Sequence, residues 1–313
     1  MKMSGNPLAG VFQDTREFYE TDEMLKKAVE ENCRNTVFYS PEHYPPVPAA
    51  QLSGHVSVTK ERTFECAFRL RRKYPDRQIA VLNFASAISP GGGVLSGAAA
   101  QEESLCRCST LYPALTQDRL DAYYYRVNRK ARDPLYSDAC IWTGDVVVCK
   151  SDEDIPKRLP HEEMIRTDVL TCAAPNLRYR DIPDKMLYEL HLQRGRHILS
   201  IAAHHEDTVL VLGAFGCGAF CNDPEVTAKA YKQLIDEMVT CLRRSCSRYT
   251  AGTLNQPIIQ PSEMRSRTDC TGVCGPLFLC VRYVHSERFL PVCLKYDLFG
   301  RRWLYGYNQI YVS

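Results

Sequence analysis

One stretch of the sequence, "SPGGGVLSGAAAQEESLCRCSTLY" from Ser89 to Tyr112, joins flexible backbone to acid side chains. Three consecutive glycines come first, and glycine is costly to order because it loses much conformational freedom. Gln101 follows with the adjacent carboxylates Glu102 and Glu103, at the start of a predicted helix. This combination suggests a backbone that wraps around a ligand, with acid chemistry beside it.

A second glycine-rich stretch, "GAFGCGAF", lies between residues 213 and 220. Both glycine stretches follow a predicted buried strand and lead into a helix, which is where open α/β sheets bind ligands. Glycine lets backbone N–H groups approach an anion, and a helix N-terminus adds a positive dipole. The pair therefore favours phosphate binding over two ordinary tight turns. No Gly-Lys-Ser/Thr occurs, which excludes a P-loop, and the Rossmann fingerprint is weak.

The composition does not indicate a nucleic-acid or membrane protein. The 313 residues include 39 Lys and Arg against 37 Asp and Glu, which leaves a formal charge of +2. The sequence has no apolar run long enough to cross a bilayer, and its N-terminus lacks the apolar segment of a secretory signal. We therefore expect a cytoplasmic or nuclear location.

The 15 cysteines are odd in number and irregularly spaced, as expected for reduced thiols inside the cell. No Cys-x-x-Cys occurs, and the nearest clusters are Cys217/Cys221 and Cys270/Cys274/Cys280. We favour buried thiols over a structural zinc site. His204 and His205 could bind a metal, but a histidine pair that complements a helix C-terminus is the preferred interpretation.

The remaining pattern predicts an α/β fold with a mixed, mostly parallel sheet covered by helices. Continuous apolar runs predict strands, and amphipathic spacing predicts helices. The strands are expected within 77–86, 139–151, 166–176 and 207–220, and the helices at 15–33, from 101 past Leu115, at 184–205 and from Asn222-Asp223-Pro224 onward.

The domain organisation is expected to comprise an N-terminal helical extension, 1–60, that packs on a catalytic domain, 61–313. A proline-rich stretch, 39–54, must be extended. A polar segment, 245–275, is expected to be a surface insertion, followed by a last strand within 276–284; the aromatic tail 285–313 has no assignment.

The stretch "VLNFASAISPGGGVLSGAAAQEESLCRCSTLY" strongly resembles the signature of bacterial, macrodomain-type poly(ADP-ribose) glycohydrolases, in which Gly-Gly-Gly precedes Gln-Glu-Glu. The resemblance continues through "DVLTCAAPN" and "RHILSIAAHHEDTVLVLGAFGCGAFCNDPEVTAKAYKQLI" and covers roughly residues 15–245. It implies a macrodomain-like fold and an intracellular enzyme of ADP-ribosylation and the DNA damage response.

The resemblance also implies a reaction and its partners. The substrate would be poly(ADP-ribose) on ADP-ribosylated proteins, cleaved at the ribose–ribose O-glycosidic bond. Cleavage would proceed from the free end and release ADP-ribose, with no cofactor and no metal. The alternatives are a non-catalytic ADP-ribose reader, which would have no use for the acid pair, and a mono-ADP-ribosyl hydrolase.

The resemblance assigns roles to individual residues. Glu103 would be the catalytic acid and later the base, Glu102 would hold substrate hydroxyls, and Gln101 would orient both. Asn83 would bind ribose hydroxyls, and Phe220 would pack on the ribose beside the scissile bond. The glycines and Cys217 would contribute backbone around the ligand: Gly91, Gly92 and Gly93 in the first loop, and Gly213, Gly216 and Gly218 around the diphosphate in the second.

The residue pattern alone leaves several of these assignments open. A Glu-Glu pair at a helix start can simply complement the dipole, a strand-end Asn such as Asn83 can cap a turn, and Phe220 can belong to the core. On a helical wheel Glu102 lies nearer the apolar face of Leu105, whereas Glu103 points away. The adenine-binding residues cannot be read from the sequence.

Overall fold

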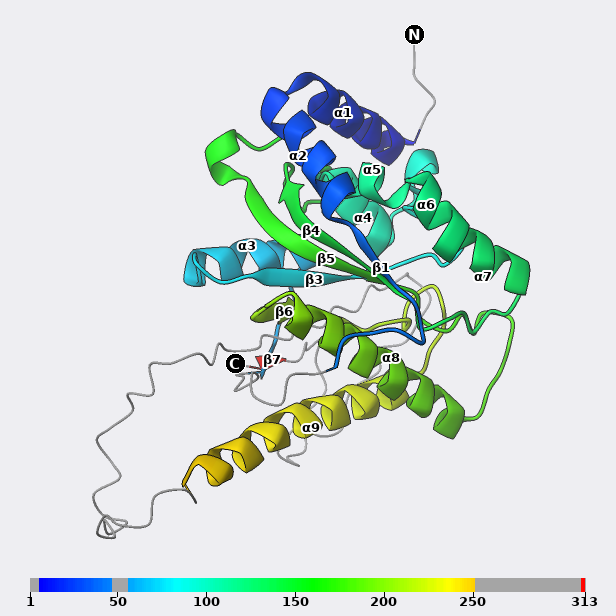
Figure 1. Cartoon of the computed structure of the whole chain (residues 1–313). Coiled ribbons are helices and arrows are strands. Elements are labelled where there is room, and N and C mark those ends of the chain that lie inside the picture. The colour runs from blue at the N-terminus through cyan, green and yellow to red at the C-terminus, as the bar shows by residue number, and fades with distance from the viewer. Residues whose placement is uncertain (1–5, 47–55, 251–310, 313) are drawn as a thin grey trace.

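A computed structural model of the chain describes residues 6–46, 56–250 and 311–312 (Figure 1). Its centre is a five-stranded sheet in the order β1-β4-β5-β3-β6. The strands are β1 (Val37–Tyr39), β3 (Ile79–Phe84), β4 (Cys140–Val148), β5 (Ile165–Cys172) and β6 (Val209–Val211). β3 pairs in parallel with β5 and β6, whereas β4 pairs antiparallel with β1 and β5. The predicted mixed sheet is confirmed, and in these residues its parallel and antiparallel pairings are equal in number.

Strand β3 occupies the interior of the sheet and is covered on both faces. Its side chains alternate, because successive residues of a strand point to opposite faces. Ala80 and Leu82 join one core cluster, whereas Ile79 and Val81 join another. This double burial explains why the sequence of the strand is continuously apolar.

Helices α8 (Asp184–His204) and α9 (Pro224–Thr250) cover one face of the sheet (Figure 1). The apolar stripe of α8, which includes Ile198 and Ile201, packs there together with Ala230 and Leu234 of α9. Asp223 begins α9 by accepting hydrogen bonds from the N–H groups of the first helical turn, and proline follows it. Both helices were predicted from the sequence and are confirmed.

The N-terminal segment forms two helices, α1 (Pro7–Thr21) and α2 (Glu23–Asn35), where the sequence predicts one helix at 15–33. The break lies at Asp22, whose backbone is extended. The Asp22 side chain accepts a hydrogen bond from the N–H of Leu25 and caps α2. α2 is followed by β1, so a strand of the central sheet comes from within the predicted extension 1–60.

The helix predicted from residue 101 past Leu115 is also two helices, α4 (Gln101–Cys108) and α5 (Leu111–Leu115). The backbone between them, at Ser109, is extended. The N–H of Thr110 donates to the Val147 carbonyl at 3.0 Å, and the Val147 N–H donates to the Thr110 hydroxyl at 3.0 Å. This exchange with β4 ends α4 after two turns.

The other elements are short, apart from helix α3, which lies on the same face of the sheet as α4. They are β2 (Val56–Val58), α3 (Thr63–Lys73), α6 (Asp118–Leu120), α7 (Arg126–Ala131) and β7 (Tyr311–Val312), with a π-helical segment at Asp121–Tyr125 and 3₁₀ turns at Val94–Ser96 and His161–Glu163. β2 and β7 form a separate antiparallel pair. The first part of the predicted insertion, 245–250, belongs to α9; its remainder and the strand predicted within 276–284 lie outside the described residues, as does most of the tail.

The histidines at the end of α8 correct one prediction. The His205 ring stacks on Trp142, with centroids 3.5 Å apart, and its Nε2 lies 2.7 Å from the Tyr39 hydroxyl. Burial lowers the pKa of His205 to about 4. His205 is therefore neutral at neutral pH and cannot complement the helix dipole as a cation.

Seven of the nine cysteines whose side chains the structure describes are buried, and all nine are free. Among all residues that the structure describes, no three His, Cys, Asp or Glu side chains are grouped so that they could bind a metal ion. No helix in the described ranges is long and apolar enough to cross a bilayer.

Candidate functional site

Gln101 fixes the start of α4 against the end of β3. Its Oε1 accepts a hydrogen bond from the Phe84 N–H at 2.9 Å, and its Nε2 donates to the Leu82 carbonyl at 2.8 Å. The Nε2 also donates to the Thr63 hydroxyl at the start of α3. Gln101 thus satisfies backbone groups of β3 beyond the residues that pair with β6, and it sets the position of the two glutamates that follow it.

Glu102 is the more buried of the two glutamates. Its Oε2 accepts a hydrogen bond from the Ser86 N–H at 2.7 Å, and Asn83 Nδ2 lies 3.5 Å from its Oε1. Burial raises the pKa of Glu102 to about 8, and the nearby charge of Glu103 acts in the same direction. Glu102 therefore carries a proton over most of the neutral range.

Glu103 points toward the glycine triplet instead. Its Oε1 accepts a hydrogen bond from the Gly93 N–H at 2.8 Å. Gly92 has a φ of +58°, and a Cβ at that position would overlap Glu103 Oε1. The close approach of the loop to this carboxylate therefore requires glycine. The structure brings the triplet and the two acids together, as the sequence pattern predicts.

The amide of Asn83 faces both Glu102 and β5. Asn83 Nδ2 donates to the Thr171 hydroxyl at 3.2 Å. Asn83 is fully buried, and its Oδ1 has no hydrogen-bond partner among the described residues. Because buried polar atoms are usually paired, this oxygen is an acceptor available to a hydroxyl group. The Gln101–Glu103 segment and Asn83 thus form one continuous polar cluster.

The second glycine loop follows β6 and is anchored by Asn222. Asn222 N–H donates to the Gly216 carbonyl at 3.0 Å, and its Nδ2 donates to the Pro175 carbonyl at 2.6 Å. Its Oδ1 lies 2.9 Å from His191 Nε2 of α8. Gly216 has a φ of +79°, and a Cβ there would lie 2.7 Å from Asn222 and Ala174. Asn222 and His191 are site residues that the sequence analysis did not identify, because their partners are distant in the chain.

The tip of this loop offers backbone donors. In the part of the chain that the structure describes, the N–H groups of Gly218, Ala219 and Phe220 donate to no acceptor. Burial raises the pKa of the Cys217 thiol to about 12, so this side chain is a thiol rather than a thiolate at neutral pH. Gly213, at the start of the loop, packs directly against Phe84. Phe220 is half-buried against the core, 6.1 Å from the Tyr136 ring.

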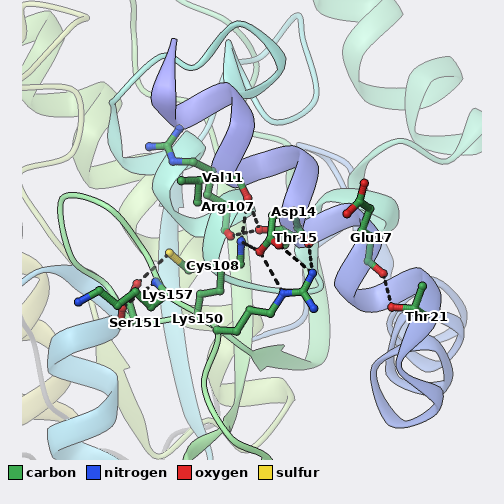
Figure 2. Close-up of polar contacts among 11 residues, drawn as sticks. Val11, Asp14, Thr15, Glu17, Thr21, Arg107, Cys108, Lys150, Ser151 and Lys157 are labelled. Carbon is green, nitrogen blue, oxygen red and sulfur yellow. Dashed lines mark hydrogen bonds and ion pairs between the residues drawn. The ribbon is translucent and has the colours of Figure 1, made fainter. Parts of the chain in front are cut away.

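Polar contacts join α1 to α4 and to Lys150, as Figure 2 shows. The buried Thr15 hydroxyl donates to the Arg107 carbonyl at 2.6 Å, near the end of α4. Lys150, just after β4, donates to the Val11 carbonyl at 2.8 Å and pairs with Asp14 at 2.7 Å. The Arg107 guanidinium donates to the Ala98 carbonyl at 2.5 Å and ties the first loop to α4. The sequence analysis identified none of these contacts.

Comparison with known proteins finds poly(ADP-ribose) glycohydrolases, both by sequence and by structure. The family profile described as microbial-type PARG, catalytic domain, matches residues 13–151. The poly(ADP-ribose) glycohydrolase from Thermomonospora curvata, solved bound to the inhibitor ADP-HPD, shares 34% identity over 72% of this chain and 84% of its own, with a TM-score of 0.61. The enzyme from Deinococcus radiodurans, solved in complex with ADP-ribose, shares 30% identity over 83% of this chain and 92% of its own, with a TM-score of 0.63. No curated protein sequence matches the chain significantly.

The mixed sheet, the two glycine loops and the adjacent carboxylates define a macrodomain-like α/β protein with an acid site at the strand ends. The chain belongs to the microbial-type poly(ADP-ribose) glycohydrolase family.

Proposed function

We propose that the chain hydrolyses the ribose–ribose O-glycosidic bonds of poly(ADP-ribose) and releases ADP-ribose. Its family consists of glycoside hydrolases that act on this polymer. The observation that carries the proposal is the placement of Glu102 and Glu103, which are bound to the Ser86 and Gly93 N–H groups beside the glycine triplet.

Glu103 is the proposed catalytic acid. Glycoside hydrolysis needs a proton on the leaving oxygen and stabilisation of an oxocarbenium-like centre. Glu103 donates the proton to the leaving ribose oxygen and then accepts one from the attacking water. Glu102 and Asn83 hold ribose hydroxyls, because Glu102 is protonated and Asn83 Oδ1 is free to accept among the described residues.

The second glycine loop binds the diphosphate in this proposal. The unpaired N–H groups of Gly218 and Ala219 face no acceptor in the described residues, and backbone N–H groups of this kind suit an anion. Phe220 packs on the ribose next to the scissile bond. The D. radiodurans enzyme complexes with ADP-ribose support a site for this ligand in the family.

The proposed cleavage starts from the free terminal ADP-ribose. Exo-cleavage predicts that monomeric ADP-ribose is the main product at the earliest time points. Chromatography of products from polymer of defined length checks this. An early population of medium-length oligomers would contradict it. The polymer on ADP-ribosylated proteins is the proposed natural substrate.

The test of the proposed function is turnover of Glu103→Gln. This variant keeps the size and hydrogen-bonding capacity of the side chain but supplies no proton. General acid–base catalysis contributes roughly 10²–10⁴-fold, so release of ADP-ribose from polymer should fall at least about a hundredfold. ADP-ribose affinity, measured by calorimetry, should change less than about tenfold, or about 1.4 kcal/mol.

Two controls separate an enzyme from a reader. Glu189→Gln, on the exposed surface of α8, should leave both measurements unchanged. Gly216→Val should lower ADP-ribose affinity first, since a side chain there meets Asn222 and Ala174. If wild-type protein binds ADP-ribose but releases none from polymer, the chain is a reader and the proposed activity is wrong.

A further inference from the structure

Three loop segments meet beside the second glycine loop and form one rim. The Leu177 N–H donates to the Phe220 carbonyl at 2.8 Å, and the Asn176 N–H donates to the Pro134 carbonyl at 2.7 Å. The segments 132–136, 176–180 and 218–220 are therefore neighbours in space, although they are far apart in sequence. We refer to these three segments as the arginine rim, because the first two carry exposed arginines.

Buried residues from α8 and from the loop before α9 fix the arginine rim from below. Arg194 of α8 is almost fully buried and donates to the Ala173 carbonyl at 2.8 Å and the Tyr136 carbonyl at 3.0 Å. Its guanidinium also pairs with Asp138 at 2.7 Å. Asn222 joins the second loop to the Pro175 carbonyl. The backbone of the rim is thus pre-organised, which lowers the entropy lost when a ligand binds.

The rim carries positive charge directly at the second glycine loop. The Arg178 guanidinium donates twice to the Ala219 carbonyl, at 3.1 and 2.9 Å, and its side chain is exposed. Arg180 pairs with Asp133 at 2.8 Å. Arg132 and Arg178 have no carboxylate partner among the described residues. The whole chain has a charge of only +2, so these two cations are a local surplus.

An aromatic side chain lies between the arginines of one segment. Tyr179, flanked by Arg178 and Arg180, is 88% exposed. The exposed ring of Tyr179 is accessible to a ligand. Exposed aromatic rings stack on nucleobases, and arginine pairs with phosphate in a fixed, forked geometry. The combination matches a ligand with both an adenine and a diphosphate.

From these observations we infer that the arginine rim binds a second ADP-ribose unit of the polymer, next to the unit in the cleft. Arg178 and Arg132 contact its diphosphate, and Tyr179 stacks on its adenine. This inference rests on the proposed function and adds a substrate-length preference to it. Under exo-cleavage, the second unit is the one that leaves with the shortened polymer.

The test removes the two charges while keeping the local geometry. Arg178→Gln retains a donor for the Ala219 carbonyl, and Arg132→Asn suits the left-handed backbone at this position, where φ is 54°. The double variant should lower kcat/KM on long polymer about five- to tenfold and flatten its decline between about 50 and about 200 mM salt. Its Kd for free ADP-ribose should stay within about twofold, because the monomer has no second unit. Tyr179→Ser alone should lower kcat/KM on polymer severalfold, with no change in the salt dependence.

A matched double variant, Lys26→Gln with Lys27→Gln on exposed positions of α2, removes the same charge elsewhere and should leave polymer kcat/KM unchanged. Equal losses in polymer kcat/KM and ADP-ribose affinity would overturn the inference, since the rim would then only support the cleft. If single-stranded DNA competes for the rim as well as the polymer does, and the arginine variant relieves this competition, the rim is a general polyanion surface. That result would also overturn the inference. A wild-type protein that releases no ADP-ribose from polymer disproves the proposed function instead.

Discussion

Glu102 and Glu103 are identical side chains that the fold places in different environments. Glu102 faces the β3 end and Asn83, whereas Glu103 faces the glycine triplet. Two adjacent carboxylates cannot both ionise easily in a buried site. The raised pKa of Glu102 resolves this conflict, since a protonated Glu102 adds no second negative charge to the pair.

The raised pKa of Glu102 predicts a pH-dependent cost to stability. Between the ordinary carboxyl value of 4.5 and about 8, the unfolded chain has lost this proton while the folded chain retains it. The free energy of unfolding therefore falls as pH rises through this window. Glu102→Gln mimics the protonated form and removes this dependence, so the variant should become more stable than wild type by on the order of a few kcal/mol at about pH 9.

Denaturant unfolding at about pH 5 and about pH 9 measures this difference. The two proteins should differ much less at the lower pH than at the higher one. Glu189→Gln, at an exposed position, should show no such divergence. A stability difference between Glu102→Gln and wild type that is equal at both pH values would show that Glu102 is not protonated in the folded state.

At the scale of elements, α4 is short and depends on its neighbours. Its eight residues carry both glutamates, and short helices are marginal without tertiary contacts. Gln101 fixes its first residue to β3, and Thr15 of α1 binds the Arg107 carbonyl near its end. The acids are therefore positioned by both ends of α4.

Thr15→Val tests the contact from α1. The substitution keeps the shape of the side chain but leaves the buried Arg107 carbonyl without its donor, which should reduce the free energy of unfolding by about 1–3 kcal/mol. Thr21 of the same helix makes a similar bond, to the Glu17 carbonyl at 2.6 Å, but only within an exposed turn (Figure 2). Thr21→Val should therefore change stability by less than about 0.5 kcal/mol.

Turnover separates a positioning effect from plain destabilisation in these variants. Measured well below the unfolding temperature, polymer turnover should fall in Thr15→Val and remain unchanged in Thr21→Val. ADP-ribose affinity should be similar in both, because the second glycine loop is held by Asn222 rather than by α1. Equal stability of the two variants would mean that the Thr15 contact does not hold α4.

The elements that the sequence predicted well are those whose own residues determine them. β3 is continuously apolar because both faces are covered, and α8 carries a regular apolar stripe. The breaks at Asp22 and Ser109 were not predicted, because each depends on how the chain packs locally or against β4. The antiparallel direction of β4 depends on which strands it pairs with, and the apolar pattern of a strand does not indicate its partners.

The site follows the same division. The glycine triplet and Gln101-Glu102-Glu103 are close in sequence, so their proximity could be predicted. Asn222, His191 and Lys150 act through partners distant in the chain, and no local pattern marks them. The residue roles stay predictions until variants are measured.

At the scale of the whole molecule, the edge at which the parallel strands end and the edge at which they begin have different tasks. The loops after β3 and β6, at the carboxyl ends of these strands, form the candidate site. The opposite edge, at the amino ends, contains a buried carboxyl pair, Asp168 of β5 and Asp207 before β6. The two carboxyls interact directly, and a hydrogen bond between them requires a shared proton. Asp168 also accepts from the Asp145 N–H at 2.7 Å, and Asp207 from Trp142 Nε1 at 3.4 Å. Arg71 is the nearby cation.

Burial raises the pKa of both carboxyls above the ordinary value of 3.8. The pair therefore stabilises the fold at low pH, and this contribution is lost as pH rises through the folded-state values.

Asp207→Asn replaces the shared proton with a permanent N–H donor to Asp168. The variant should unfold at a higher denaturant concentration than wild type at about pH 8, with a smaller gain at about pH 5. Its turnover of polymer should match wild type, because the substitution lies at the edge opposite the glycine loops. Asp76→Asn, at an exposed turn, should change neither quantity. A loss of stability at both pH values would show that Asp207 is ionised and bound as a carboxylate, and a loss of turnover without a loss of stability would show that the two edges are coupled.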